Sequence, residues 1–210
     1  MRRYGIRSQQ MLGLGVPTLR SIARSLGRDH ALALELWRAG YLEARLLASM
    51  IDEPGRVTAP QMERWARDFD SWALCDGCCQ ELFSKSRLAW PKAFDWSRRP
   101  EEFVKRAGFA LVAQLAVHDR EATDVPFLRF LSVIEREATD GRPYVRKGVN
   151  WSLRQIGKRN PTLRRAAIVS AERIRRQGSP AGRWIASDAL RELRSPSVRR
   201  RVRRRAERRR

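Results

Sequence analysis

The feature that most constrains the fold is an apolar repeat of helical period that runs through almost the whole chain. Apolar side chains recur about every 3.6 residues, and signals that end a helix return at short intervals. No segment shows the convincing alternation of apolar and polar residues that a half-buried strand requires. The pattern therefore predicts an all-α protein of roughly ten or more helices. The predicted helix starts lie at or near Pro17, Asp29, Thr58, Ser71, Pro100, Thr123, Pro143, Pro161 and Ser179.

The helices are short, and no linker divides them before the C-terminal end. Short helices in antiparallel pairs favour a curved α-solenoid, although the repeat is too blurred to assign a period. We expect a single domain of stacked helix pairs over residues 1–195. Residues 196–210 differ, because RRRVRRRAERRR from Arg199 onward repels itself, and we expect a disordered tail that binds phosphate without sequence preference.

The charge of the chain indicates its partner. It has 44 Lys plus Arg against 23 Asp plus Glu, a formal net charge of +21, which attracts polyanions at long range. Nucleic acid is therefore the leading partner. We expect no membrane partner, because no apolar run approaches the roughly 20 residues that span a bilayer. The start MRRYGIRSQQ lacks the apolar stretch of a signal peptide, and three closely spaced cysteines suit a reducing compartment, so we expect a cytoplasmic protein.

The stretch FDSWALCDGCC contains three cysteines at helical spacing: Cys75, Cys78 and Cys79. A zinc site normally needs a fourth ligand, and neither His30 nor His118 is near in sequence. We therefore favour buried cysteines that pack as small apolar side chains, and expect no metal site. Zinc bound with a distant histidine and a reactive thiol stay open as alternatives. For both histidines, which lie at helix ends, we favour capping or packing.

The same stretch places Trp72 and Asp76 one helical turn apart, so they share a face. Trp72 alone is typical of a core aromatic. Asp76 is harder to explain, because burying a carboxylate without a partner is costly. A buried salt bridge and a catalytic carboxylate both account for it, and the pattern does not decide between them.

A second cluster lies in RPYVRKGVNWSLRQIGKRNP, residues 142–161. Lys147, Trp151, Arg154 and Lys158 fall on one helical face, where a solvated face would leave the Trp exposed among cations. A nucleic-acid surface accounts for both the charges and the Trp. The predicted DNA-binding residues of this segment are Arg146, Lys147, Arg154, Lys158 and Arg159.

Two further cations, Lys105 and Arg106, interrupt the apolar helix EEFVKRAGFALVAQLAV. At least one of them must pair with an acid or reach a phosphate. Glu101 and Glu102, one turn earlier, are the acids available within the helix.

The segments DSWALCD, EEFVKRAGFALVAQLAVHD, VRKGVNWSLRQIGKRNP, GVPTLRSIARSLG and LWRAGYLEARLLASMI resemble the AlkD-type DNA alkylation repair enzymes, from about Tyr4 to about Leu193. The resemblance implies a curved solenoid of HEAT-like repeats that holds duplex DNA. It also implies hydrolysis of the N-glycosidic bond of N3- and N7-alkylated purines, without base flipping and without a metal or organic cofactor.

The resemblance assigns roles residue by residue. Asp76 matches the family's catalytic Asp, and Trp72 the aromatic residue one turn before it. Arg106 matches the Arg that contacts the DNA backbone near the lesion, although Lys105 could take the phosphate instead. Trp151 matches a second Trp that packs against the sugar. Two departures stand out: YGI at residue 4 places the start about one helix late, and SWALCD lacks a second Trp and another acid.

The leading hypothesis is a monofunctional alkylpurine DNA glycosylase that acts as a monomer on duplex DNA. The runner-up is a helical-repeat protein that binds damaged or branched DNA without cutting a bond. A scaffold for acidic proteins would explain the charge but not the set of Trp, Asp, Arg and Trp.

Overall fold

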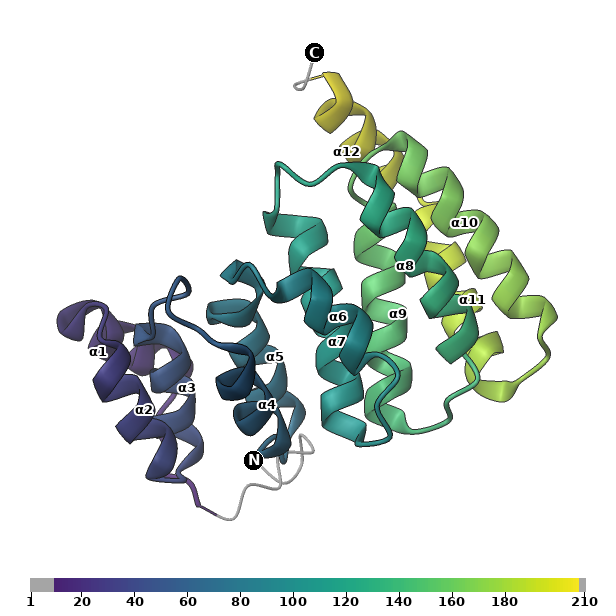
Figure 1. Cartoon of the computed structure of the whole chain (residues 1–210). Helices are drawn as coiled ribbons and strands as arrows, with labels where there is room; N and C mark the ends of the chain where they lie inside the picture. Colours follow the sequence, from purple (N-terminus) through teal and green to yellow (C-terminus); the bar gives the residue numbers. More distant parts are fainter. Residues whose placement is uncertain (1–9, 208–210) are drawn as a thin grey trace. The chain divides into compact units, whose positions relative to one another are not determined.

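The computed structural model describes residues 10–207. Two predictions concern residues outside this range: the position of YGI at residue 4 relative to the family, and the last three arginines of the expected tail. Contacts divide the chain into two compact units, residues 1–92 and 93–210. The described residues contain helices and no strand, so the predicted all-α fold class is confirmed (Figure 1).

The N-terminal unit is built around α3, which contacts α1, α2 and α5. Helix α3 is buried on most sides, and most of its residues are apolar. Trp37 and Trp65 stack beside it with ring centroids 3.9 Å apart. The helices of this unit are α1 (Val16–Leu26), α2 (His30–Arg38), α3 (Leu42–Ile51), α4 (Ala59–Arg67), α5 (Trp72–Glu81) and the 3-10 helix η2 (Phe83–Lys85), followed by the start of α6 (Ala89–Trp96).

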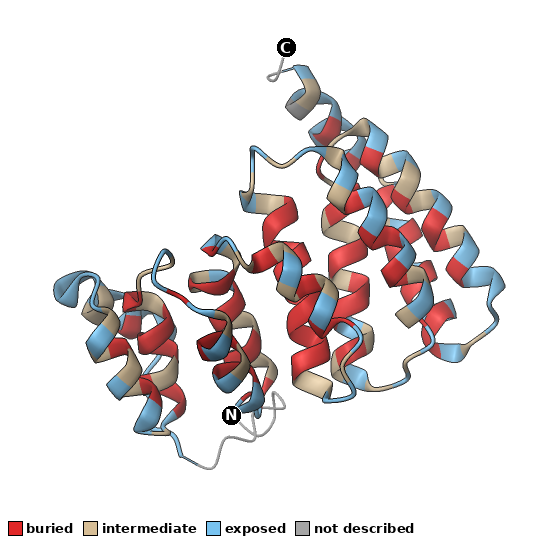
Figure 2. Cartoon of the chain, viewed as in Figure 1, coloured by how far each residue is buried: buried red, intermediate tan, exposed pale blue. Residues whose placement is uncertain are grey.

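The C-terminal unit is built around α7 and α9, which lie side by side. Residues 104–116 of α7 are all buried, as the continuous red ribbon in Figure 2 shows. Helix α9 also contacts α8, α10 and α11. The helices of this unit, after the end of α6, are α7 (Glu102–His118), α8 (Asp124–Glu137), α9 (Pro143–Gly157), α10 (Pro161–Arg176), α11 (Pro180–Leu193) and α12 (Pro196–Glu207).

Local capping explains most helix starts. Asp29 and Ser179 accept hydrogen bonds from backbone N–H groups at the starts of α2 and α11, as the sequence predicted. Thr58 caps α4 through the N–H of Gln61. The Gln61 side chain does not complete a capping box, because its Nε2 donates to the buried Asp52 at 2.6 Å. His30 lies on the same carboxylate, with Nδ1 2.6 Å from Oδ1 of Asp52.

Helix α12 replaces the disordered tail that the sequence predicted. Val198 and Val202 are four residues apart, and they bury one side of the helix, with exposures of 7% and 2%. The Ser195 hydroxyl accepts from the N–H of Val198 at 3.3 Å and caps the first turn. Arginine has a high helix propensity, so one apolar stripe is sufficient to order the segment.

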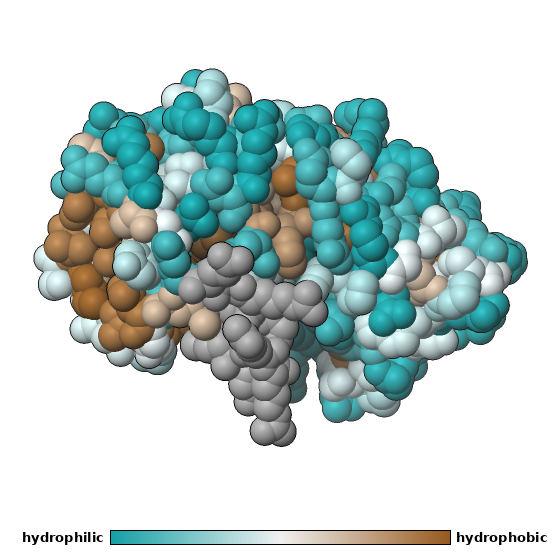
Figure 3. Space-filling model, turned by 90° about the horizontal axis from the view of Figure 1, so that it is seen from below, coloured by the Kyte–Doolittle hydropathy of each residue, from teal (hydrophilic) through white to brown (hydrophobic). Residues whose placement is uncertain are grey.

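The surface is largely hydrophilic. Figure 3 shows a hydrophobic area on the N-terminal unit in the view from below. The exposed large apolar side chains at the start of this unit are Met11, Leu12, Leu14 and Val16. Within the described residues, no helix combines the length and the apolar composition that crossing a bilayer requires.

Candidate functional site

Helix α5 carries two of the four predicted catalytic residues. The Ser71 hydroxyl caps it by accepting from the N–H of Leu74 at 3.4 Å, as predicted. Trp72 and Asp76 are half-buried, one turn apart, at the border of the buried side. The buried residues of α5 are Leu74, Cys75, Cys78 and Cys79. The helix therefore places a half-buried acidic residue one turn from a half-buried aromatic residue.

Gly77 sets the position of this part of α5. A Cβ atom on Gly77 would lie 2.6 Å from Cδ2 of Leu46 on α3, so the end of the Leu46 side chain would have to shift to admit a larger residue. Glycine thus allows α5 to approach α3 closely, and the neighbouring Asp76 is held by that packing.

The three cysteines are free thiols with no solvent exposure, which confirms the prediction that they are buried. Burial raises the pKa of the Cys78 thiol, and Cys75 and Asp52 raise it further. Within residues 10–207, no group of three or more His, Cys, Asp or Glu side chains is placed to hold a metal ion. The cysteines act as small apolar side chains against α3 and its neighbours.

Helix α7 carries the paired cations Lys105 and Arg106, both buried. The Lys105 ammonium lies 2.6 Å from Oε2 of Glu137 and 3.0 Å from Oδ2 of Asp140. These acids, at the end of α8 and just beyond it, replace the Glu101 and Glu102 that the sequence offered as partners. Arg106 donates from Nη1 to the carbonyl oxygen of Tyr144 on α9 at 2.7 Å. Its guanidinium is therefore held at the contact between α7 and α9.

The acids around Lys105 are shifted towards their charged forms. Hydrogen bonds from Arg142 lower the pKa of Asp140 far below its ordinary value; burial opposes this, and Lys105 adds to it. Burial raises the pKa of Glu137, but hydrogen bonds from Lys105 and Arg136 outweigh it, so the net pKa lies below the ordinary 4.5. Lys105 thus belongs to a network of opposite charges within the C-terminal unit.

A ladder of polar contacts joins α9 to α11. Arg146 lies over the ring of Trp184, 4.6 Å from its centroid. One turn further, the side-chain amide of Asn150 donates to Asp188 at 2.7 Å. At the end of α9, Arg154 and Lys158 each lie 2.7 Å from a carboxylate oxygen of Glu192.

The contacts between α9 and α11 engage only part of the basic face that the sequence predicted on α9. Arg154 and Lys158 turn towards the acids of α11, whereas Lys147 is exposed and Trp151 is half-buried. Arg159 is also buried: its guanidinium donates to the carbonyl oxygen of Ala122 at 2.6 Å and lies over the Phe127 ring. Among the predicted DNA-binding residues, Lys147 is the cation most open to a phosphate.

The four predicted catalytic residues come from two units. Trp72 and Asp76 share one helix of the N-terminal unit. Arg106 and Trp151 lie on the adjacent helices α7 and α9 of the C-terminal unit. The assignment of all four residues to one site stays a prediction.

Sequence reasoning did not find the acids that organise the cations. Trp184, Asp188 and Glu192 follow one another at intervals of four residues, which match the intervals of Arg146, Asn150 and Arg154 on α9. This matched spacing was the available signal, because helices that cross at a small angle align residues at intervals of three or four. It could be recognised only once α9 and α11 were known to be neighbours.

Most of the positive charge lies in the C-terminal unit. Residues 93–210 contain 30 Lys plus Arg against 13 Asp plus Glu, which accounts for +17 of the formal charge of +21. This unit therefore supplies most of the long-range attraction for a polyanion.

Comparisons with known proteins bear on the fold and the family of this chain. One solved structure is similar to this chain, with a TM-score of 0.73 and 18% sequence identity over 82% of this chain and 77% of that one. It is described as "a new family of proteins related to the HEAT-like repeat DNA glycosylases with affinity for branched DNA structures", and at this identity the likeness shows the fold alone. No curated protein matches the chain. The family model of the DNA alkylation repair enzymes matches residues 1–193, and the chain belongs to that family.

Proposed function

We propose that this protein is a DNA glycosylase that hydrolyses the N-glycosidic bond of N3- and N7-alkylated purines in duplex DNA. The observation that carries the proposal is the half-buried Asp76, one turn from the half-buried Trp72, in a member of the DNA alkylation repair family. A surface that only binds a polyanion gains nothing from a carboxylate. A carboxylate does favour a reaction that passes through a cationic sugar, because its negative charge stabilises that cation.

The proposed chemistry follows from the charge of the damaged base. An alkylated purine is already cationic, so its bond to C1′ breaks readily, and the base leaves as a neutral molecule with the bonding electron pair. The deoxyribose that remains resembles an oxocarbenium ion. The Asp76 carboxylate stabilises this cation and orients a water molecule, whose oxygen bonds to C1′ as a proton passes to the carboxylate or to solvent. The products are free base and an abasic site.

Aromatic faces add to this stabilisation. The π-electron density of Trp72 and Trp151 favours a cation nearby, by about 1 kcal/mol each at cation–π strength. In this proposal the two rings flank the deoxyribose, and the base is not flipped into a pocket. No metal or organic cofactor is needed, because alkylation has already made the base a good leaving group.

The C-terminal unit holds the DNA backbone in this proposal. Arg106, fixed by the Tyr144 carbonyl, lies against the backbone near the lesion. Arg146 and the exposed Lys147 bind phosphates directly. Lys105, Arg154, Lys158 and Arg159 contact phosphate only if DNA displaces their present partners, which are Glu137, Asp140, Glu192 and backbone carbonyls.

The test measures free base released from duplex DNA that contains N7-methylguanine. The wild-type protein is expected to release the base, and Asp76→Asn to lose at least about 100-fold in single-turnover rate. Asp70→Asn is the matched control, because Asp70 is an exposed carboxylate just before the same helix. Equal rates for wild type and Asp76→Asn would sink the assignment.

A second function, binding of branched or damaged DNA without catalysis, is favoured by the similar solved structure, whose description names affinity for branched DNA. The base-release assay distinguishes this binding function from the glycosylase function. Absence of released base from the wild type, together with tight binding to a four-way junction that Asp76→Asn does not alter, would establish the binding function.

We also propose that the protein acts as a cytoplasmic monomer that associates with the nucleoid. Light scattering of the purified protein, alone and with one equivalent of duplex DNA, is expected to give the mass of one chain and of a one-to-one complex.

A further inference from the structure

The C-terminal unit contains a groove that the proposed catalytic chemistry does not use. It lies between α10 and α12, has a volume of about 680 Å³, and opens to solvent. Its floor is apolar, from Pro161, Pro196, Val202 and Ala206, and its charged lining is Arg164, Arg199, Arg200, Arg203 and Glu207. Four cations therefore share the groove with one acid.

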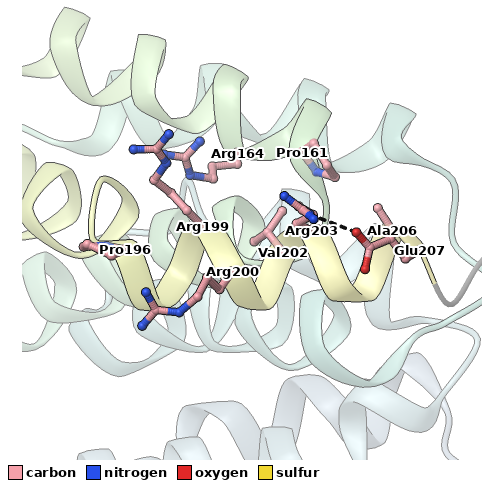
Figure 4. A pocket seen from close by; sticks show the side chains of 9 residues that line it. All are labelled: Pro161, Arg164, Pro196, Arg199, Arg200, Val202, Arg203, Ala206 and Glu207. Atoms are coloured by element: carbon pink, nitrogen blue, oxygen red, sulfur yellow. Dashed lines mark hydrogen bonds and ion pairs between the residues drawn. The ribbon is translucent and has the colours of Figure 1, made fainter.

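Two of these cations are held close together. Figure 4 shows the guanidinium groups of Arg164 and Arg199 side by side at one end of the groove. Burial lowers the pKa of Arg164, and the positive charge of Arg199 lowers it further. Arg164 is fixed in this position because its Nε donates to the carbonyl oxygen of Leu193 at 2.7 Å. An exposed Arg199 thus lies beside a fixed Arg164, where an anion would relieve the repulsion of the two charges.

The other end of the groove is partly neutralised. Arg203 donates from Nε to Glu207 at 2.9 Å, and both side chains are exposed. An exposed pair of this kind is weak and exchanges readily with solvent ions. Arg203 is therefore available to a phosphate that displaces Glu207. Among the described residues, no acid has to be displaced before a phosphate binds Arg164 and Arg199.

We propose that the groove between α10 and α12 binds the phosphodiester backbone of nucleic acid, with Arg164 and Arg199 clamping one phosphate and the apolar floor lying against the adjoining sugar. Planar guanidinium groups suit phosphate oxygens, and a pair of them gives a directional site instead of a diffuse field. Nucleic acid is favoured over a free anion because the groove is open to solvent and part of a unit with a net charge of +17. The inference rests on nucleic-acid binding, and not on glycosylase chemistry.

The test is the salt dependence of binding to unmodified duplex DNA, so that it does not depend on base excision. Each phosphate contact contributes about 0.9 to the slope of log K against log salt. Arg164→Gln with Arg199→Gln is expected to lower the magnitude of the slope by about 1 to 2. The matched control is Arg165→Gln with Arg201→Gln, which removes two exposed charges from the same helices outside the groove. This control is expected to change the slope by less than half as much.

Two single variants guard against a folding defect. Arg199→Gln keeps the bond between Arg164 and Leu193, and is expected to lower the slope by about 1 with an unchanged melting temperature. Glu207→Gln releases Arg203, and is expected to raise the slope by about 1. An equal loss in the groove and control double variants would overturn the proposal in favour of a diffuse field.

Two further measurements distinguish nucleic acid from free phosphate and from membrane lipid as the ligand of the groove. If inorganic phosphate at constant ionic strength raises the melting temperature of wild type but not of Arg199→Gln, while the DNA slope stays the same, the site binds free phosphate and the proposal fails. If Arg199→Gln loses binding only to phosphatidylserine vesicles, the groove is a membrane contact and the proposal also fails.

Discussion

Lys105 lies inside the core helix α7, and its ammonium nitrogen is 3.0 Å from Oδ2 of Asp140, beyond the end of α8. Both side chains are nearly buried, with exposures of 11% and 12%. The pair therefore ties the start of α7 to the turn that leads into α9. The pair also shows how a buried cation is accommodated in a helix that is mostly apolar.

Because of this network, we expect the free energy of unfolding to fall at acid pH. The folded state lowers the pKa of Asp140 below its ordinary 3.8, mainly through Arg142, so the charged carboxylate stabilises the fold above that pH. The contribution is lost as the pH falls from about 4 through the lower folded value. Asp140→Asn is expected to reduce the free energy of unfolding by about 2 kcal/mol at pH 7.

Urea denaturation of both proteins between pH 7 and pH 2.5 checks this. The difference between wild type and Asp140→Asn should shrink steadily below pH 4. A difference that stays constant over this range would contradict the network.

The cations of α9 should separate into two kinds. Lys147 is exposed, so Lys147→Gln is expected to lower the salt slope of DNA binding by about 0.9 without changing stability. Arg154 is paired with Glu192, so Arg154→Gln is expected to leave the slope unchanged and to cost about 1 kcal/mol of stability. Binding titrations at several salt concentrations, with urea denaturation alongside, measure both effects. A slope that falls equally in both variants would show that DNA displaces Glu192 from Arg154.

Trp72 offers a test of the aromatic contribution to catalysis. Replacing Trp72 by Leu removes a cation–π contribution of about 1 kcal/mol, so the single-turnover release of N7-methylguanine should slow about fivefold. Trp72→Phe keeps an aromatic face and should recover part of the rate. Equal rates for the Leu and Phe variants, with unchanged circular dichroism, would show that Trp72 only packs.

Gly108 tests the close packing at the start of α7. A Cβ there would lie 2.6 Å from the backbone nitrogen of Ser97 and 3.0 Å from the carbonyl oxygen of Ala93. Backbone atoms cannot move aside cheaply, so Gly108→Ala is expected to cost about 2 kcal/mol despite the better helix propensity of Ala. The control Gly141→Ala has no heavy atom within 4 Å of the added Cβ and should be nearly neutral. Melting temperatures of the two variants give the comparison.

Helix positions could be predicted from the sequence because they depend on neighbours along the chain. Asp29, Ser71 and Ser179 cap through bonds that span three residues, so the local pattern was sufficient. The order of α12 could not be predicted in the same way. Its stability depends on burying Val198 and Val202 against other helices, and a run of arginines conceals that stripe.

The candidate site shows the same division. That Trp72 and Asp76 share one face of α5 followed from their spacing alone. The acids that pair with Lys105 and Arg154 lie 32 or more residues away, so no local pattern could identify them. A cationic face read from one helix therefore overestimates the charge that remains for a ligand.

The buried cysteines have a consequence for a member of the DNA alkylation repair family. Electrophiles that alkylate purines also attack thiolates, which are stronger nucleophiles than thiols. Cys75, Cys78 and Cys79 have no solvent exposure, and the raised pKa of Cys78 keeps its sulfur protonated. The fold thereby keeps its own sulfur atoms from reacting with the reagents whose DNA lesions this family repairs.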